Sequence, residues 1–305
     1  MVFETMPTHI PGIDVIEILI IDDGSSDKTV EVATKLGAHH IIRHRRNKGL
    51  AASFNEGIHE GLKLGADIIV NTDGDNQYPQ ELIPELIRPI MDRTADIVVG
   101  DRQVSTINHF SPFKKAMQKF GSHMVQRAAG IKVEDAPSGF RAYSREAAMR
   151  INVITDFSYT METIIQAGKK RIAITHVPVT TNAKTRESRF FKNIFQHMRK
   201  SGVAIIRSYA MYEAFRIFFL GGVLIFLIGV IPYARFGGMW LVAGEPLGGH
   251  LQSLIFGAVF MILGALVVFL GIVADLLSIN RKLLEDVLHR LKRMEYGETE
   301  SEKLF

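Results

Sequence analysis

Two acidic turns stand out because each follows a run of aliphatic residues. Residues 18–21 are all Ile or Leu and lead directly into Asp22 and Asp23, and a second aliphatic run ends shortly before Asp73 and Asp75. Both runs have the composition of a buried strand. In an open α/β sheet, ligands bind at the carboxyl ends of the strands. The sequence therefore predicts one polar crevice that receives both turns, with the chemistry of a site for a nucleoside diphosphate and a metal ion.

Asp73 and Asp75 are separated by one residue, so both carboxylates can bind the same divalent cation. Mg²⁺ and Mn²⁺ prefer such hard oxygen ligands and often bind substrate phosphates as well. A bound cation would offset the charge that develops on a departing nucleoside diphosphate. Taken alone, an Asp-Gly-Asp turn is more often ordinary turn chemistry, so the weight of this prediction depends on the other motifs.

Two later segments, residues 217–233 and 251–274, contain no Asp, Glu, Lys or Arg. A helix needs roughly 20 mainly apolar residues to span a bilayer, and the first segment reaches that length if Phe215 and Arg216 are included. Two buried helices of a soluble domain are the alternative, but the remaining chain is too short to supply the core that they would need. We expect a transmembrane hairpin, and hence an integral membrane protein with two spans.

The distribution of charge predicts an orientation for this hairpin. The chain has 305 residues, of which 47% are hydrophobic, which allows one domain of about 200 residues plus a small membrane module. Basic residues cluster at 184–200 and 281–293, on either side of the hairpin, whereas the loop at 234–250 has a single Arg. By the positive-inside tendency, the soluble part and the C-terminus face the cytoplasm. The absence of cysteine excludes a disulfide scaffold and thiolate metal sites.

The soluble part alternates strands and helices. We predict strands at 16–21, 40–43, 67–71 and 95–100 and helices at 25–35, 50–64 and 79–93, then helices at 113–129, 145–151 and 159–168 and a strand at 172–178. This alternation predicts an α/β fold with a mostly parallel sheet wrapped by helices. Residues 190–212 mix Phe, Ile and Met with Lys, His and Arg, which is typical of an amphipathic helix in the membrane interface. The alternative is a helix that packs on the sheet.

Four motifs carry a resemblance to a known family. In chain order they are DDGSSD at 22–27, NKG at 47–49, DGDNQYP at 73–79 and SGFR at 138–141. In this order they resemble family 2 glycosyltransferases of the GT-A fold, and most of all the dolichol-phosphate mannosyltransferase-like branch, which moves a sugar from a nucleotide sugar to a polyprenyl phosphate. The resemblance covers roughly residues 15–200, and the hairpin is similar to the membrane anchors of some members.

The resemblance implies a Rossmann-like GT-A domain with a mostly parallel sheet, followed by an interfacial helix and a two-helix transmembrane hairpin. The expected boundaries are 1–188 for the GT-A domain, 189–214 for the interfacial helix, 215–276 for the hairpin and 277–305 for a basic cytoplasmic tail. The family's opening strand, which normally lies inside the sheet, has no counterpart in residues 1–14. We therefore expect a truncated chain, or exposed sheet edges and weakened donor binding.

The resemblance also implies where a nucleotide-sugar donor binds. Asp22 and Asp23 would contact its base and ribose, and Asp73, Asp75 and Gln77 would bind its diphosphate together with Mg²⁺ or Mn²⁺. The full nucleotide-sugar set is Asp22, Asp23, Gly24, Ser25, Lys48, Asp73, Arg186 and Ser188.

A basic loop follows the last predicted strand. Arg186 and Ser188, assisted by Lys184 and Arg189, look like the family's mobile loop that closes over the diphosphate. The alternative is a basic segment that binds anionic lipid headgroups.

Arg102, Ser138 and Arg141 look like ligands of an acceptor phosphate. Arg suits this role because its planar fork binds two phosphate oxygens and stays charged. For each Arg the alternative is an ion pair with no part in binding. Glu162 resembles a family carboxylate near the sugar, and its alternative is an exposed charge on a helix. The implied catalytic set is therefore Asp75, Arg102, Arg141 and Glu162.

The implied reaction transfers a hexose from a GDP-mannose-type or UDP-glucose-type donor to the phosphate of a polyprenyl or dolichyl phosphate. A phosphate acceptor is already anionic at neutral pH, so positioning and charge neutralisation matter more than a strong general base. In-line attack would invert the anomeric configuration and give a β-linked product from an α-linked donor.

Three alternatives to this function follow from the sequence. A processive polysaccharide synthase of the same family is one, because residues 196–200 (QHMRK) faintly match its Gln-x-x-Arg-Trp motif, but the Trp is absent. A catalytically inactive membrane scaffold is another. Nucleic-acid binding is not expected, because the basic clusters flank the membrane segments and lack base-stacking aromatic residues. The sequence leaves open the donor base, the sugar, the lipid chain length and whether chains associate into a homo-oligomer.

Overall fold

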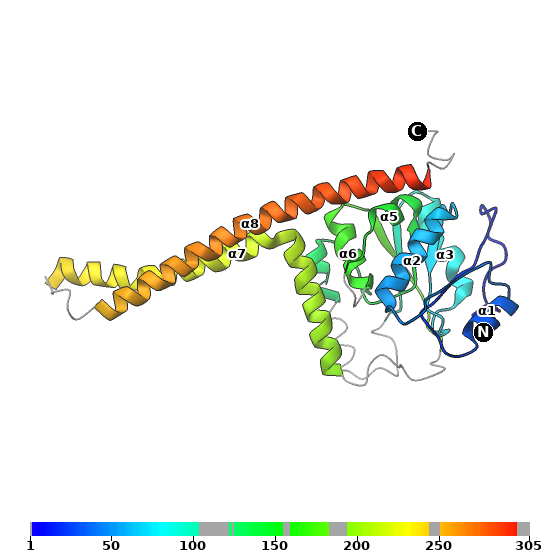
Figure 1. The fold of residues 1–305 in the computed structure, drawn as a ribbon, viewed down its shortest axis with the longest axis horizontal. Coiled ribbons are helices and arrows are strands. Elements are labelled where there is room, and N and C mark those ends of the chain that lie inside the picture. Colours follow the sequence, from blue (N-terminus) through cyan, green and yellow to red (C-terminus); the bar gives the residue numbers. More distant parts are fainter. Residues whose placement is uncertain are drawn as a thin grey trace. The chain divides into compact units, whose positions relative to one another are not determined.

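The computed structural model describes residues 2–103, 122–123, 125–154, 159–182, 194–243 and 251–297, with the backbone alone for 194–214. The chain divides into two compact units, and Figure 1 shows its elements in sequence colours. The sheet unit contains Met1–Ser208 together with Leu288–Phe305, and the hairpin unit contains Tyr209–Val287.

The first part of the sheet unit alternates strands with helices, as predicted. Its elements are β1 (Leu19–Asp22), α1 (Thr29–Lys35), β2 (His40–Arg43), α2 (Leu50–Lys63), β3 (Ile68–Asn71), η1 (Gln80–Leu82), α3 (Ile83–Met91) and β4 (Ile97–Asp101). The later described elements are β5 (Arg141–Ser144), α5 (Arg145–Arg150), α6 (Tyr159–Lys169) and β6 (Ile174–Pro178). Most of the helix predicted at 113–129 lies outside the described residues. Strand β5 was not predicted, because four residues that run directly into a helix show no period-two pattern.

The strands form two sheets instead of the single mostly parallel sheet that was predicted. Strands β1 and β2 pair in parallel, and a second sheet has the order β3-β5-β4-β6. In the second sheet β4 and β6 are parallel, whereas β5 is antiparallel to both of its neighbours. The α/β class is therefore confirmed, but the sheet is mixed because β5 enters between β3 and β4 from the opposite direction.

Helix α2 covers both sheets. Two of its glycines face isoleucines of different sheets: a Cβ on Gly57 would lie 3.4 Å from Ile21 of β1, and one on Gly61 would lie 3.0 Å from Ile69 of β3. In the described part of the chain, β1 pairs only with β2, and β3 pairs only with β5. Strand β3 is half-buried along its length, unlike the buried strand β4. The two sheets are therefore joined through α2 side-chain packing, without a shared hydrogen-bond ladder.

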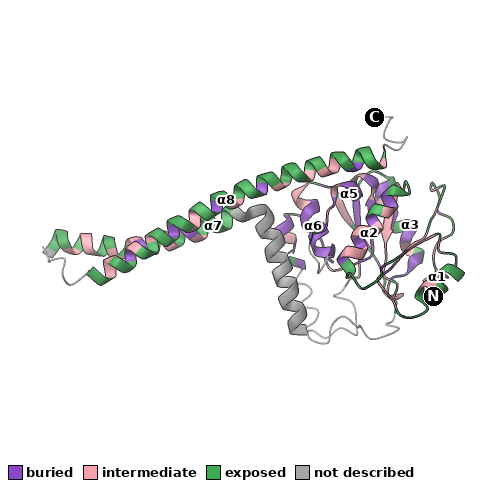
Figure 2. Cartoon of the chain, in the orientation of Figure 1, coloured by how far each residue is buried: buried purple, intermediate pink, exposed green. Residues whose placement is uncertain are grey.

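Apolar side chains fill the space on both sides of the larger sheet. One cluster joins α2, α5 and α6 to the sheet, and it includes Phe54, Leu62 and Tyr159. The other joins α3 to the opposite face, and the N-terminal residue Ile10 belongs to it. Figure 2 shows the buried residues concentrated in these layers. The larger sheet is therefore packed on both of its faces.

The end of α8 (Leu251–Tyr296) packs within the sheet unit. Arg145, at the start of α5, donates hydrogen bonds to the carbonyl oxygens of Ala66 at 3.1 Å and Tyr296 at 2.7 Å. Lys292 is buried, and its Nζ donates to the carbonyl oxygen of Ile151 at 3.3 Å. Ile151 is the C-terminal cap of α5 and Tyr296 the last residue of α8, where carbonyl groups have no partner inside their own helix. The last turns of α8 are thus part of the domain core, whereas a basic tail was predicted from residue 277.

The hairpin unit contains most of α7 (Ile194–Ala243) and the first part of α8. Two stretches are long and apolar enough to cross a membrane, Phe215–Val242 and a window within Leu251–Tyr296, and only 11% and 17% of the tested windows are buried. Core helices of a soluble protein would be mostly buried. Large apolar side chains such as Leu224, Ile231 and Phe256 are instead exposed (Figure 2). These features indicate a membrane protein.

Glycines bring α7 and α8 into backbone contact. A Cβ on Gly229 would lie 2.7 Å from the carbonyl oxygen of Gly257, and a Cβ on Gly264 would lie 2.7 Å from that of Gly222. Real Cβ atoms do not approach that closely, so only glycine fits these positions. Small residues at helix contacts are a common basis of helix association in membranes, where water does not drive the packing.

We predict that Gly229→Leu weakens the hairpin by about 1–3 kcal/mol, because the added side chain must displace the backbone of α8. The measurement is thermal unfolding of the full chain in lipid nanodiscs, followed by circular dichroism. Gly237→Leu is the matched control, because a Cβ at Gly237 meets no atom within 4 Å. Equal melting of the two variants would contradict the glycine contact.

Candidate active site

The polar loops of the larger sheet meet because β5 is antiparallel. Arg141, the first residue of β5, pairs with Asn71 at the end of β3 and with Val99 near the end of β4. The residues just before Arg141 must therefore lie beside the loops that follow both strands. Those loops carry the second acidic turn and Arg102, so the fold brings together two of the four predicted motifs, DGDNQYP and SGFR, with Arg102 beside them.

Gly139 is the centre of this junction. Its carbonyl oxygen accepts a hydrogen bond from Asn71 Nδ2 at 2.8 Å, and its N–H donates to the Tyr78 hydroxyl at 3.1 Å. Asn71 Nδ2 also donates to the Tyr159 hydroxyl at 2.8 Å. A Cβ at Gly139 would lie 3.0 Å from both Asp73 Oδ2 and the Tyr159 oxygen. A side chain at this position would therefore crowd the Asp73 carboxylate and the Tyr159 hydroxyl, so that one of them would have to shift.

Asp73 is the most strongly perturbed carboxylate of the site. Burial raises the pKa of Asp73 to about 6, the neighbouring Asp75 charge raises it further, and Arg102 acts in the opposite direction. Asp75 accepts a hydrogen bond from the backbone N–H of Gln77 at 3.1 Å, which shapes the turn. The raised pKa means that the surrounding protein does not fully compensate the charge of Asp73.

This donor set fits a divalent cation that is shared with a substrate. Asp73 and Asp75 supply hard oxygens, and among the described residues no group of three or more His, Cys, Asp and Glu side chains could hold a metal. Mg²⁺ is commonly bound by one or two carboxylates together with substrate phosphates. The side chain of Gln77, the third predicted ligand, belongs to the same turn.

Arg102 lies in the same loop cluster and is held by a residue that the sequence did not single out. Its Nε and Nη2 donate to the two oxygens of Asp135 at 2.7 and 2.8 Å, and its backbone N–H donates to the same carboxylate at 3.1 Å. Burial opposes the charge of Arg102, but the Asp135 carboxylate outweighs it and raises the pKa of the guanidinium. The Arg102 guanidinium is therefore fixed in orientation and stays charged at every accessible pH.

Arg141 does not lie where its predicted role requires. The side chain is fully buried, and its three nitrogens donate to the carbonyl oxygens of Ser138 and Ala136 at 2.8 and 2.7 Å and to Thr163 Oγ1 at 2.7 Å. Each of the three nitrogens is engaged and the side chain is fully buried, so in this structure Arg141 holds the 136–139 segment in place. Neither a phosphate ligand nor a surface ion pair, the two readings of the sequence, describes these contacts.

Ser138 and Glu162 are both buried. Ser138 lies in the segment held by Arg141, next to Gly139. Glu162, in the first turn of α6, accepts hydrogen bonds from the backbone N–H of Ile154 at 3.1 Å and from Gln166 Nε2 at 3.2 Å. The exposed helix charge that was the alternative for Glu162 is therefore wrong, and its predicted role near the sugar stays a prediction.

The first acidic turn lies at the end of β1. Asp22 is buried, accepts a hydrogen bond from the backbone N–H of Ser25 at 3.1 Å, and faces Arg43 Nε at 3.3 Å. Gly24 has a φ of +75°, and a Cβ there would lie 2.9 Å from the backbone of Arg46. The acidic turn therefore rests directly on the loop that follows β2.

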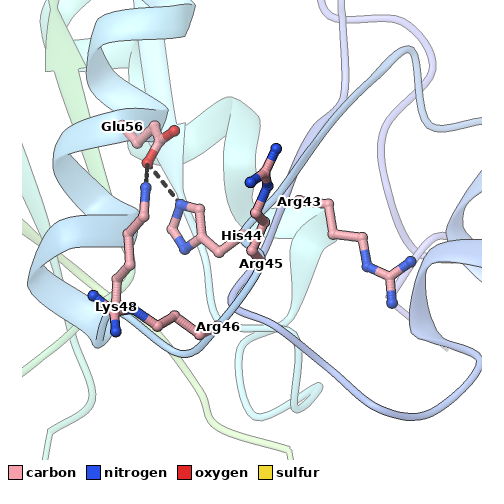
Figure 3. Close-up of a pocket in the computed structure, with 6 residues that line it drawn as sticks. All are labelled: Arg43, His44, Arg45, Arg46, Lys48 and Glu56. Carbon is pink, nitrogen blue, oxygen red and sulfur yellow. Dashed lines mark hydrogen bonds and ion pairs between the residues drawn. The ribbon is translucent and has the colours of Figure 1, made fainter.

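That loop lines a basic cavity of about 510 Å³. Its lining residues, shown in Figure 3, are Arg43, His44, Arg45, Arg46, Lys48 and Glu56. Lys48 Nζ contacts Glu56 at 3.2 Å. The predicted nucleotide residue Lys48 is thus one of several cations around one cavity beside the first acidic turn.

Several residues of the site were missed by sequence reasoning. Asn71, Tyr78, Asp135 and Tyr159 position the second turn and Arg102, and His44 and Glu56 belong to the basic cavity. Two of them had a visible signal in the sequence: Tyr78 lies inside the DGDNQYP motif, and Asp135 lies three residues before the SGFR motif. The predicted loop residues Lys184, Arg186, Ser188 and Arg189 lie outside the described residues.

Comparison with known proteins agrees with this architecture. The model of the family "Glycosyl transferase family 2" matches residues 12–151. A dolichol-phosphate mannosyltransferase of Pyrococcus furiosus is 33% identical over 195 residues, which are 60% of this chain and 53% of that protein. A UDP-N-acetylglucosamine–dolichyl-phosphate N-acetylglucosaminyltransferase of Methanococcus voltae is 29% identical over 189 residues, covering 54% of this chain and 74% of that protein. The chain belongs to glycosyltransferase family 2 and is a glycosyltransferase.

A solved structure confirms the fold class. Glucosyl-3-phosphoglycerate synthase from Mycobacterium tuberculosis, in complex with Mn²⁺, UDP and glucosyl-3-phosphoglycerate, superposes with a TM-score of 0.52 at 18% identity, over 68% of this chain and 72% of that one. At this identity the likeness concerns the GT-A-like fold alone.

We predict that Gly139→Ala weakens the binding of Mn²⁺ by about tenfold or more, because the new methyl group displaces the Asp73 carboxylate. Isothermal titration calorimetry of the full chain with Mn²⁺ and a nucleoside diphosphate measures this. Gly74→Ala is the control, because a Cβ at Gly74 meets no atom within 4 Å. Unchanged affinity in Gly139→Ala would show that Asp73 has room to adjust.

We also predict that metal affinity falls as the pH is lowered through about 6, the raised pKa of Asp73, because the proton competes with the cation. The expected loss is about tenfold per pH unit below that value.

In the metal-free chain, the folding stability changes with pH in the opposite direction. Because the pKa is raised from 3.8 to about 6, the contribution of Asp73 to stability is complete below 3.8 and is lost as the pH rises through about 6. Asp73→Asn should remove both dependences, and a pH-independent Mn²⁺ affinity in the wild type would contradict the shift.

Proposed function

We propose that this chain transfers a hexose, with inversion, from a nucleotide sugar to the phosphate of a polyprenyl or dolichyl phosphate. The observation that carries the proposal is the junction at Gly139, where a carboxylate turn suited to a cation lies beside Arg102, an oriented and permanently charged group. Relatives that are named for transfer to dolichyl phosphate support this acceptor. Their different sugars leave GDP-mannose-type and UDP-sugar donors as candidates.

The donor half of the site would use both acidic turns. Asp73, Asp75 and Gln77 would hold Mg²⁺ or Mn²⁺, which supplies charge neutralisation for the departing nucleoside diphosphate. Asp22, Gly24 and Ser25 lie in the turn at the end of β1, and Lys48 lines the cavity at the end of β2; the nucleoside would bind there. Asp23 shapes the loop that carries Lys48. Arg186 and Ser188 remain predicted contacts of the diphosphate.

The acceptor half would depend on Arg102. Asp135 binds one edge of the Arg102 guanidinium. The N–H groups of Arg102 that Asp135 does not bind therefore have a defined direction in which to donate to phosphate oxygens. Ser138 would add a hydroxyl to the same phosphate. Arg141, which was predicted to bind this phosphate, is reassigned as the residue that positions Ser138 and Gly139.

The proposed reaction does not need a strong general base. The acceptor phosphate oxygen is the nucleophile, attacks the anomeric carbon opposite the leaving diphosphate, and forms the new bond as the old one breaks. Holding the two partners in line is the main contribution of the protein. Positive charge at Arg102 would bind the acceptor, and Glu162 would lie near the sugar.

The membrane hairpin would keep this site at the bilayer, where the lipid acceptor is found. We propose two spans, with the catalytic domain and the C-terminus on the cytoplasmic side, because the basic clusters flank the hairpin and the loop between the spans has one Arg.

We predict that Asp75→Asn lowers transfer by at least about a hundredfold, because charge neutralisation at the leaving group is lost. The assay incubates the full chain in membranes with Mn²⁺, polyprenyl phosphate and a panel of radiolabelled nucleotide sugars, followed by lipid extraction. Asp92→Asn is the control, since that carboxylate is exposed at the end of α3 and pairs only loosely with Arg88, at 3.7 Å.

Two different results would contradict the proposal. Wild-type turnover by Asp75→Asn would remove the metal assignment but leave the enzyme. No labelled lipid from the wild type with any donor would remove the acceptor or the activity itself.

A further inference from the structure

The His44 ring lies between two carboxylates. Its Nδ1 is 2.8 Å from Asp23 Oδ1 and its Nε2 is 2.6 Å from Glu56 Oε2, and the side chain is only 1% exposed. Asp23 follows β1, His44 follows β2 and Glu56 lies in α2, so the ring joins three elements. Figure 3 shows the contact with Glu56 at the wall of the basic cavity.

This geometry selects the charged form of the ring. A neutral imidazole has one N–H and cannot donate to two carboxylates, whereas an imidazolium donates from both nitrogens. The Asp23 hydrogen bond is the largest cause that raises the pKa of His44, burial acts against it, and Glu56 adds to the rise. The charged groups around the ring are Asp23, Glu56 and Lys48, with Arg43, Arg45 and Arg46 on the cavity wall.

The bridge from Asp23 through His44 to Glu56, here called the clamp, fixes the loop that carries the basic residues of the cavity. Asp23 Oδ1 accepts the backbone N–H of Lys48 at 2.7 Å, and Oδ2 accepts that of Gly49 at 3.0 Å. Gly49 is the N-terminal cap of α2 and has no side chain to accept these groups. On the other side, Glu56 accepts from both His44 and Lys48 Nζ. Both carboxylates are thus engaged by the protein and direct the Lys48 backbone and ammonium group.

We propose that His44, as an imidazolium, is a positioning residue of the donor site that holds Lys48 and the 43–48 loop in the conformation that receives the nucleotide. This inference rests on the proposed function. It predicts that the loop loosens when His44 loses its proton, so that nucleotide binding weakens as the pH rises, while the chemical step is not affected directly.

The test compares nucleotide binding across pH in the full chain. UDP and GDP, each with Mn²⁺, are titrated calorimetrically into the wild type, His44→Gln and His44→Asn. The two variants replace the ring with an amide that can reach one carboxylate only. His40→Gln is the control, because His40 lies on the same β2 strand and is partly exposed.

The expected result is a ratio that depends on pH. Near pH 6.5, the ordinary pKa of His, both variants should bind about tenfold more weakly than the wild type. At alkaline pH the wild-type ring is neutral as well, so the ratio should fall towards one. Protonation of the metal ligands and of the nucleotide changes the affinity of the wild type and of the variants equally, so it cancels in this ratio. A merely structural role would give a ratio that is independent of pH.

Two outcomes overturn the inference in distinguishable ways. Wild-type affinity of both variants at every pH would refute the role of His44 and leave the proposed function intact. Failure of the wild type to bind either nucleotide would instead refute the donor site on which the inference rests. A further measurement does not depend on function: with ¹⁵N-labelled histidine, the signal absent from His44→Gln must titrate above the ordinary pKa, and titration at or below it refutes the charged clamp. Circular dichroism confirms that each variant is folded.

Discussion

The antiparallel insertion of β5 between β3 and β4 is the constraint on which the rest of the site depends. It forces the 136–140 segment to the edge where both neighbouring strands end. Arg141 makes this arrangement specific, because a buried guanidinium is costly unless its donors are satisfied. Its three acceptors include carbonyl oxygens of Ala136 and Ser138, which are available only when the segment folds back. A charge buried for structural reasons thereby positions Gly139 against Asp73.

The two acidic turns differ in how their charges are balanced. At the first turn, Asp23 receives two backbone N–H groups and the His44 ring, and these contacts lower its pKa although burial opposes them. At the second turn, burial dominates and the pKa of Asp73 rises to about 6. The charge of Asp23 is therefore compensated by the protein, and this residue shapes a loop. The second turn has uncompensated charge, which is the condition in which a carboxylate gains most from a cation.

The last turns of α8 belong to the sheet unit, although they follow the hairpin in the sequence. The second apolar helix does not end at the hairpin, because α8 continues to Tyr296 and its last turns join the core of the sheet unit. Arg145 links the carbonyl ends of α2 and α8 around the start of α5. The catalytic domain is therefore built from both sides of the hairpin in the sequence. A domain boundary drawn at a single position, such as residue 188, cannot describe this organisation.

The α/β class, the apolar hairpin, the family and the acidic turns could be predicted before the fold was known, because each depends on local composition or on a short motif. Strands β2 and β3 and helix α2 were predicted within a residue or so, since their patterns are strong and uninterrupted. The contacts of single polar residues, in contrast, became clear from the fold. Arg141 belongs to a binding motif by sequence and to the buried core by its contacts. His44 and Glu56 have no sequence pattern that marks them. Such roles depend on partners that are distant in the chain, because the charge of a side chain is stabilised by the groups that the fold brings within hydrogen-bond distance. Periodicity and spacing do not encode that information.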